Sequence, residues 1–162
     1  MHEDISPATD DQDSMVDAVL SASRVLVAIA ARSLADAGEE VTLTQYRSLV
    51  ILASRGPQSV AALADAVAVT SPTASRLCER LVRKGLVGRR TDRHDRRRVR
   101  IVLTEAGHDL VDTVTERRRQ EIADLLASVP AEIQRSAVAA LRQLTASAGE
   151  VPEQDWSSGW DL

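Results

Sequence analysis

The chain has 162 residues, a hydrophobic fraction of 44% and a net charge of −4, which predict a single globular domain, with or without an extension. Aromatic residues make up 2% and phenylalanine is absent, so an aliphatic core is expected. One cysteine excludes an internal disulfide and favours a reducing compartment. The apolar run Val25–Ala31 is too short to span a membrane, and the acidic N-terminus does not resemble a signal peptide, so a soluble cytoplasmic protein is expected.

The charge is unevenly distributed. Residues 70–104 contain eleven basic residues and three acids, a net charge of +8, which leaves −12 for the rest of the chain. A surface of one sign suits a polyanion, whereas an acidic remainder repels it and keeps the protein soluble. A merely solvated basic face is the alternative, but the density of arginine favours a surface that binds a polyanion.

Residues 1–12 are acidic and are predicted to form a disordered tail. Over residues 13–36, apolar side chains recur at helical spacing without a proline or glycine, which predicts one long amphipathic helix. A second helix is expected to begin after Thr42, because Gln45 follows it at the spacing of a capping box. This helix should end near Ser54, before a Gly–Pro pair.

Two short helices follow. Ser59 is placed to cap an alanine-rich helix, and residues 67–70 form a tight turn after it. The next helix is expected to have Ser71 as its N-cap and Pro72 as its first helical residue, and to end at Gly85. A short helix followed after a few residues by a second one with small polar and basic residues near its start is typical of a helix-turn-helix unit.

In the second of these helices, Leu77, Leu81 and Val82 are predicted to face the core. Polar and basic side chains are left to point outward. They are Thr73, Ser75, Arg76, Arg80 and Arg83.

Two strand-like segments, residues 86–90 and 98–104, flank a polar tip at residues 91–97 and predict a β-hairpin. A hairpin directly after a recognition helix is a wing. Thr104 is placed to cap a further amphipathic helix, and Pro130 restarts the chain into a last one. The acidic tail after these helices holds both tryptophans, Trp156 and Trp160.

The residue types of the basic segment suit double-stranded DNA. A helix N-terminus with small hydroxyl side chains can approach phosphates and base edges in the major groove, and Arg76 is long enough to reach guanine or a phosphate. Simple helix capping is an equally good interpretation of Ser71. Arginines at the hairpin tip suit a narrow minor groove, and Asp95 beside Arg97 is expected to hold an arginine by an ion pair. Residues 70–104 contain no aromatic side chain on which bases could stack, which disfavours binding to single-stranded nucleic acid or RNA.

Three segments resemble the multiple antibiotic resistance regulator (MarR) family of bacterial transcription factors: "LTQYRSL", "ADAVAVTSPTASRLCERLVRKGLV" and "DRRRVRIVLTEAG". The resemblance implies a mainly α (α+β) winged-helix fold of about six helices with a two-stranded β-hairpin wing, in an intertwined homodimer. It implies a DNA-binding domain at residues 42–104 and a helical dimerisation region at residues 13–41 and 105–148. Residues 149–162 would then be an acidic, tryptophan-containing tail.

The resemblance also implies a repressor that binds a palindromic operator, with its two reading helices about 34 Å apart. Arg97 would enter the minor groove, and Asp95 would structure the wing. Taken with the pattern of the residues themselves, the predicted DNA contacts are Ser71, Thr73, Ala74, Ser75, Arg76, Arg80, Arg89, Arg93, His94, Arg96 and Arg97.

Many members of this family bind a small lipophilic or phenolic ligand between the dimerisation helices and the reading domain. By resemblance, Tyr46 and Arg47 would lie near such an effector site; core packing and surface charge are their alternative roles. No cofactor is expected.

Other chemistry is disfavoured by the sequence. Cys78 is predicted to be a buried small hydrophobe rather than a redox sensor, because no second cysteine could resolve an oxidised thiol. His2, His94 and His108 do not have the spacing of a metal site. Since no catalytic constellation is recognisable, an enzyme is not expected. A winged helix that binds an acidic protein is the alternative to DNA binding, although a protein interface would be depleted of charge at its centre.

Overall fold

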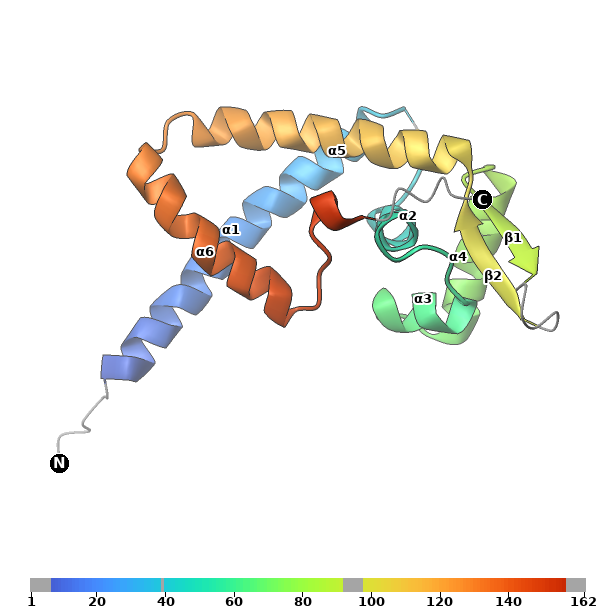
Figure 1. The fold of residues 1–162 in the computed structure, drawn as a ribbon, viewed down its shortest axis with the longest axis horizontal. Helices are drawn as coiled ribbons and strands as arrows, with labels where there is room; N and C mark the ends of the chain where they lie inside the picture. The colour runs from blue at the N-terminus through green and yellow to red at the C-terminus, as the bar shows by residue number, and fades with distance from the viewer. Residues whose placement is uncertain (1–6, 39, 92–97, 157–162) are drawn as a thin grey trace.

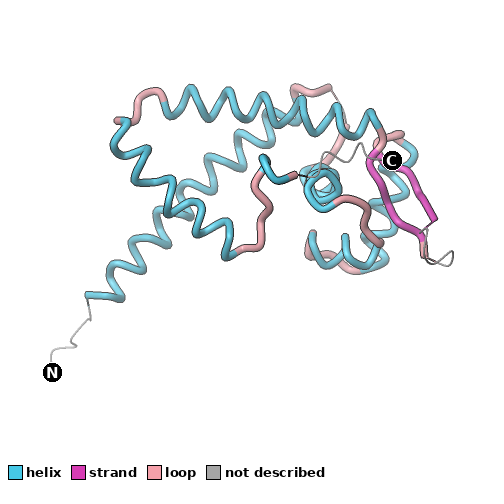
Figure 2. Tube along the Cα trace, in the orientation of Figure 1, coloured by secondary structure: helices cyan, strands magenta, loops and turns pink. Residues whose placement is uncertain are grey.

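A computed structural model describes residues 7–38, 40–91 and 98–156. Figure 1 shows two parts joined by α5: a head (α2, α3, α4, β1 and β2) at one end and an arm (α1, α5 and α6) that extends from it. Figure 2 shows that the described chain is mainly helical, with one hairpin, so the predicted winged-helix fold is confirmed. The elements are α1 (Pro7–Ala35), α2 (Leu43–Arg55), α3 (Val60–Ala66), α4 (Ser71–Arg83), β1 (Val87–Thr91), β2 (Val99–Leu103), α5 (Glu105–Leu126), α6 (Ala131–Ser147) and the 3-10 turn η1 (Glu153–Asp155).

Three helix starts form as the local sequence predicts. At α2, the Gln45 N–H donates to Thr42 Oγ1 (3.2 Å), and the Thr42 N–H donates to Gln45 Oε1 (2.9 Å), which completes the capping box. The Ser59 hydroxyl accepts a hydrogen bond from the backbone N–H three residues ahead in α3 (3.1 Å). The Thr104 hydroxyl accepts one from the backbone N–H three residues ahead in α5 (3.1 Å). Each cap satisfies a backbone donor that the first turn of a helix leaves without an intrahelical partner.

The beginning of α1 differs from the prediction. The helix begins at Pro7, so the prediction of a disordered tail is wrong for residues 7–12, and residues 1–6 lie outside the described residues. Proline suits the first turn of a helix because its missing N–H would have had no partner there.

The start of α4 is shifted by one residue. Thr70 is the N-cap, with extended backbone angles, and Ser71 is the first helical residue, so the prediction of Ser71 as N-cap is wrong. The hydroxyls of Thr70 and Thr73 lie 3.0 Å apart and bond each other, and no side chain caps the backbone. Pro72 is accommodated because the N–H that it lacks has no helical partner in the first turn.

The wing is a two-stranded antiparallel sheet in which Val87 pairs with Leu103 and Thr91 with Val99. The sequence did not suggest a third segment beside it: Gln58 and Ile101 exchange two backbone hydrogen bonds, of 3.1 and 2.7 Å. This bridge ties the chain between α2 and α3 to the second strand. Residues 92–97, the predicted wing tip, lie outside the described residues.

The core of the head is almost entirely aliphatic, as predicted from the composition, with Tyr46 as its buried aromatic residue. Val111 and Val114 from the first half of α5 are buried with it, so α5 belongs to the head as much as to the arm. Val82 is 36% exposed, and its predicted place in the core is wrong; Cys78 takes that place at 0% exposure. The largest fully buried side chains are Leu49, Ile51, Leu63, Leu81, Ile101, Val111 and Val114.

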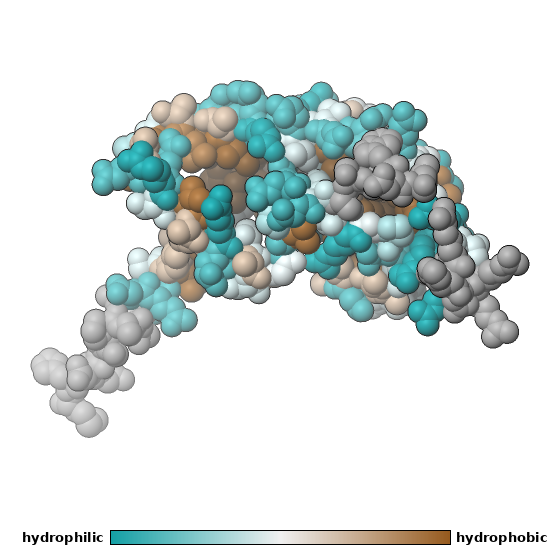
Figure 3. All heavy atoms as spheres, in the orientation of Figure 1, coloured by the Kyte–Doolittle hydropathy of each residue, from teal (hydrophilic) through white to brown (hydrophobic). Residues whose placement is uncertain are grey.

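Most apolar side chains of α1 and all those of α6 lie outside the core, whereas Ile29 and Leu34 near the end of α1 are buried. No residue of α6 is buried, and Figure 3 shows apolar side chains gathered where α5 and α6 meet. Residues 11–35 of α1 are long and apolar enough to cross a membrane by length and composition, which the short run Val25–Ala31 did not suggest. The large exposed apolar residues of α1 and α6 are Met15, Val16, Val19, Leu20, Val25, Leu26, Val27, Ile133, Val138, Leu141 and Leu144.

The C-terminal end of α1 is anchored on α5. Arg32 donates to Glu121 through two nitrogens, at 3.2 and 2.8 Å, and the buried Ser33 hydroxyl donates to the same carboxylate (3.1 Å). These hydrogen bonds lower the pKa of Glu121. The anchor directs the apolar remainder of α1 away from the head.

Candidate nucleic-acid interface and an adjoining cavity

The rotation of α4 determines which side chains reach solvent. Ala74, Leu77, Cys78 and Leu81 are buried at helical spacing and pack on the head. Ala74 is 1% exposed, so its predicted DNA contact is wrong: the side chain faces the core. The exposed predicted contacts of this helix are Ser71, Thr73, Ser75, Arg76 and Arg80.

A groove of about 310 Å³ runs between α4 and the N-terminus of α2. Arg76 and Arg80 line one side of it, and Thr42 and Thr44 line the other. Across the described part of the chain, no ion pair joins either arginine to an acid. The two guanidinium groups, the two hydroxyls and the positive end of α2 suit phosphate oxygens.

Thr42 and Thr44 were missed by the sequence analysis. The capping box located the start of α2, but nothing in the sequence placed that start beside α4.

The wing adds further positive charge. Arg89 is exposed on β1, and the register places Arg90 opposite Arg100 on β2. The remaining predicted wing residues lie outside the described residues: Arg93, His94, Asp95, Arg96 and Arg97. The described basic surface therefore consists of the outer face of α4 and the adjacent strands.

Cys78 lies beneath this surface and is fully buried, as predicted. Burial raises the pKa of its thiol, and the positive charge of Arg89 opposes that shift more weakly. A thiol is less reactive than its thiolate, so the environment favours a packing role. Among the described residues, no group of three or more His, Cys, Asp or Glu side chains is placed to hold a metal ion.

A larger cavity, of about 950 Å³, lies between the arm and the head. Tyr46 and Arg47 both line it, next to apolar side chains of α1 and α2. The Tyr46 hydroxyl lies 3.5 Å from Thr115 Oγ1, and burial raises the pKa of Tyr46. Arg118 from α5 and Trp156 from the C-terminal segment also line the cavity, and no signal in the sequence placed either residue there.

Comparison with known proteins identifies the family. The MarR family model matches residues 41–99. The transcriptional repressor NicR of Pseudomonas putida is 38% identical over 81 residues, which are 50% of this chain and 51% of that protein, so the chain matches about half the length of this curated relative.

Solved structures match over more of the chain. RV1404 from Mycobacterium tuberculosis is 37% identical, with a TM-score of 0.81, over 94% of this chain and 99% of that one. A mutant of S. aureus MepR, solved bound to an oligodeoxyribonucleotide, is 26% identical, with a TM-score of 0.60, over 83% of this chain and 97% of that one. MepR bound to ethidium bromide matches with a TM-score of 0.59 at the same identity, over 83% and 95%. The chain therefore belongs to the MarR family of transcriptional regulators.

Proposed function

We propose that the protein is a repressor that binds a palindromic site in double-stranded DNA as a homodimer. The observation that carries the proposal is the groove between α4 and α2, where Arg76 and Arg80 face two hydroxyls at a helix N-terminus. Support also comes from the relatives: a MepR mutant has been solved with an oligodeoxyribonucleotide, and NicR is a transcriptional repressor.

In this proposal α4 enters the major groove. Ser71, Thr73 and Ser75 let the helix approach closely, and Arg76 reaches a base edge or a phosphate. Arg80 and the N-terminus of α2 bind the backbone on one side, and Arg89 and the wing-tip arginines bind it on the other, with the tip in the minor groove. Phosphate contacts set the position of the helix, and base contacts set the sequence that it selects.

The homodimer follows from the exposed arm. A monomer would leave the apolar faces of α1 and α6 in water, and contiguous apolar surface of that kind marks an interface. A second copy would cover both faces and would place two α4 helices on one side of a duplex. The polar side chains within α1 disfavour a membrane span, because Arg32 and Ser33 bind Glu121 of α5. We therefore place the protein in the cytoplasm.

We also propose that a small lipophilic or phenolic effector binds in the cavity beside Tyr46 and Arg47. The cavity is mostly apolar in lining and has Tyr46, Arg47 and Arg118 as polar groups that could orient a ligand. The ethidium complex of MepR shows that one relative takes up an aromatic compound.

Selection from random duplexes tests the function. The purified protein should enrich an inverted repeat, and Arg76→Ala should weaken binding to the enriched duplex by about 1–3 kcal/mol for each subunit. Arg135→Ala removes the same charge from the exposed surface of α6 and should leave binding unchanged within about twofold. Enrichment of no repeat, with tight binding to an acidic protein instead, would show that the winged helix serves protein contacts.

A further inference from the structure

We propose that residues 149–156, here named the latch, fasten the head to the arm, and that opening the latch weakens DNA binding. The latch leaves the end of α6 and crosses to α2 and α5 (Figure 1). α6 makes few contacts with the other helices of its own chain, so the latch is its main connection to the head. The DNA-binding part of the inference rests on the proposed function.

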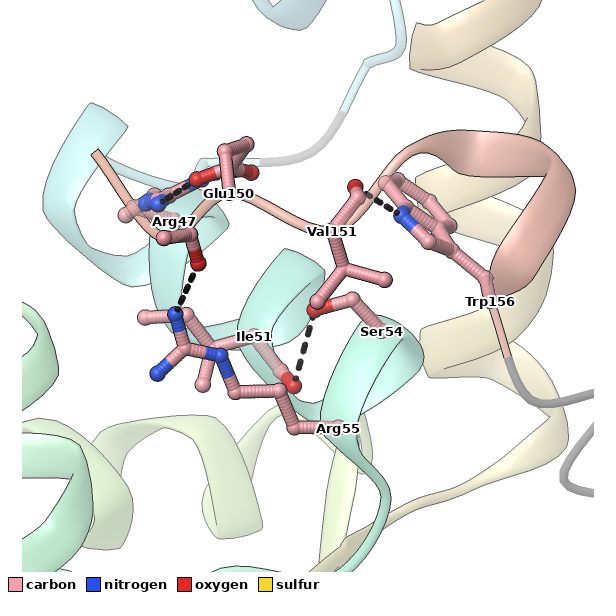
Figure 4. A network of polar contacts seen from close by, with 8 residues as sticks. Arg47, Ile51, Ser54, Arg55, Glu150, Val151 and Trp156 are labelled. Atoms are coloured by element: carbon pink, nitrogen blue, oxygen red, sulfur yellow. Dashed lines mark hydrogen bonds and ion pairs between the residues drawn. The ribbon is translucent and has the colours of Figure 1, made fainter. Parts of the chain in front are cut away.

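The direction of the latch is set by the end of α6. The Gly149 N–H donates to the Ala146 carbonyl (3.0 Å), and the Glu150 N–H donates to the Thr145 carbonyl (3.0 Å). These two bonds form a Schellman motif, in which the residue after the cap has a left-handed backbone. Gly149 has φ = +67° and meets this requirement without steric cost. The motif turns the chain so that Glu150 points toward α2 (Figure 4).

Two arginines of α2 hold this turn. Arg47 donates to both carboxylate oxygens of Glu150, at 2.8 and 2.5 Å, in the paired geometry that makes arginine–carboxylate contacts specific. Arg55 donates to the Gly149 carbonyl (3.1 Å) (Figure 4). The hydrogen bonds from Arg47 lower the pKa of Glu150, with smaller contributions from the charges of Arg47, Arg55 and Arg118.

The other end of the latch is held by packing and a second ion pair. Trp156 is half-buried against the core of the head, and its indole N–H donates to the Val151 carbonyl (3.0 Å). Glu153 pairs with Arg119 of α5 at 2.5 Å. The latch thus touches α2 and α5 at once, and it also lines one side of the cavity.

These contacts give the latch a mechanical role. A dimer holds its two heads through the arms, so the spacing of the two α4 helices depends on how rigidly each head is fixed to its arm. An open latch would let each head sample more orientations. Binding both half-sites would then restrict each head to one orientation, and the entropy lost in that restriction would reduce the affinity for DNA.

Fluorescence tests whether the latch is closed. In Trp160→Phe, Trp156 is the only tryptophan left, and it should have blue-shifted emission and low accessibility to acrylamide. Adding Glu150→Gln should raise the ratio of open to closed latch by about two- to fivefold, because a partly exposed ion pair changes an equilibrium constant by up to about that factor. Quenching of Trp156 by acrylamide should therefore rise. Glu132→Gln, on an exposed carboxylate of α6, is the matched control.

Binding to the selected duplex tests the coupling. Glu150→Gln should lose affinity in proportion to the fraction of heads whose latch it opens, at most about two- to fivefold; a chain ending at Ala148, which has no latch, should lose more, and a chain ending at Trp156 should bind as the full chain does. Light scattering on every variant should give the mass of the parent, so that a loss of assembly is not the cause. Unchanged quenching in Glu150→Gln would refute the latch, and raised quenching with full DNA affinity would refute its coupling. A parent that selects no duplex would instead refute the proposed function, and the fluorescence would still decide whether the latch closes.

Discussion

The head and the arm use the same aliphatic residues in opposite ways. In the head, Leu49, Leu81 and Ile101 are each at 0% exposure, and the helices close around them. In the arm, Leu20 is 52% exposed and Leu141 is 56% exposed, although both lie on helices with clear apolar stripes. The apolar side chains of the head are packed within one chain, whereas most of those on α1 and α6 are not.

This difference indicates that the head provides the stability of each subunit and that the arm provides the surface for assembly. Burial of the head core stabilises each subunit on its own, because the apolar area is removed from water within that subunit. The same energy is available to the arm only when a second surface covers it. Substitutions in the two regions should therefore respond differently to protein concentration.

The largest effect is expected in the arm. Leu141→Glu should raise the dissociation constant of the dimer more than a hundredfold, because a carboxylate buried against an apolar seam costs roughly 3–4 kcal/mol or more. Sedimentation over a range of concentrations measures the constant. Gln143→Glu adds the same charge two residues along α6, on its other side, and should leave the mass unchanged. A monomeric parent would contradict the proposed homodimer.

The head should respond without any dependence on concentration. Leu81→Ala should lower the free energy of unfolding by about 2–5 kcal/mol, because it leaves a cavity at a fully buried site. Val82→Ala is the neighbouring control at 36% exposure and should cost less than about 1 kcal/mol. Denaturant titration at two protein concentrations measures both. Equal losses in the two variants would mean that α4 is rotated from the position described.

A smaller effect is expected from the charge asymmetry of the two regions. Arg80→Gln should reduce the magnitude of the slope of log affinity against log salt by about two in a dimer, roughly one phosphate contact for each subunit. Arg135→Gln, in the arm, should leave the slope unchanged. Titration of the selected duplex between low and moderate salt gives both slopes. An affinity that does not depend on salt would argue against phosphate binding by the head.

The smallest effect is expected at Cys78. Its thiol is buried and its pKa is raised, so a thiol reagent at neutral pH should label the folded protein only as fast as the head opens. Absorbance of the released chromophore follows the labelling, and a denaturant brings it to completion. Rapid labelling of the folded protein would mean that the thiol is accessible, and it would favour a role for Cys78 as a redox sensor.

The sequence by itself determined the local structure of this protein. Capping residues at Thr42, Ser59 and Thr104 specify helix starts through bonds to backbone only three residues away, and apolar spacing identifies the helices. The dense arginines of residues 70–104 located the basic segment. Local signals were weakest at the ends of elements, which explains the errors at Pro7 and Ser71.

The tertiary structure alone decided which residues meet across the chain. It buried Ala74 and exposed Val82, brought Thr44 beside Arg76, and joined Arg47 to Glu150 across about a hundred residues of sequence. Periodicity specifies a face only to within part of a helical turn, and it carries no information about the partner of that face. Contacts between distant segments depend on how all the apolar faces of the chain are covered together, so the sequence of one helix does not specify which segment packs against it.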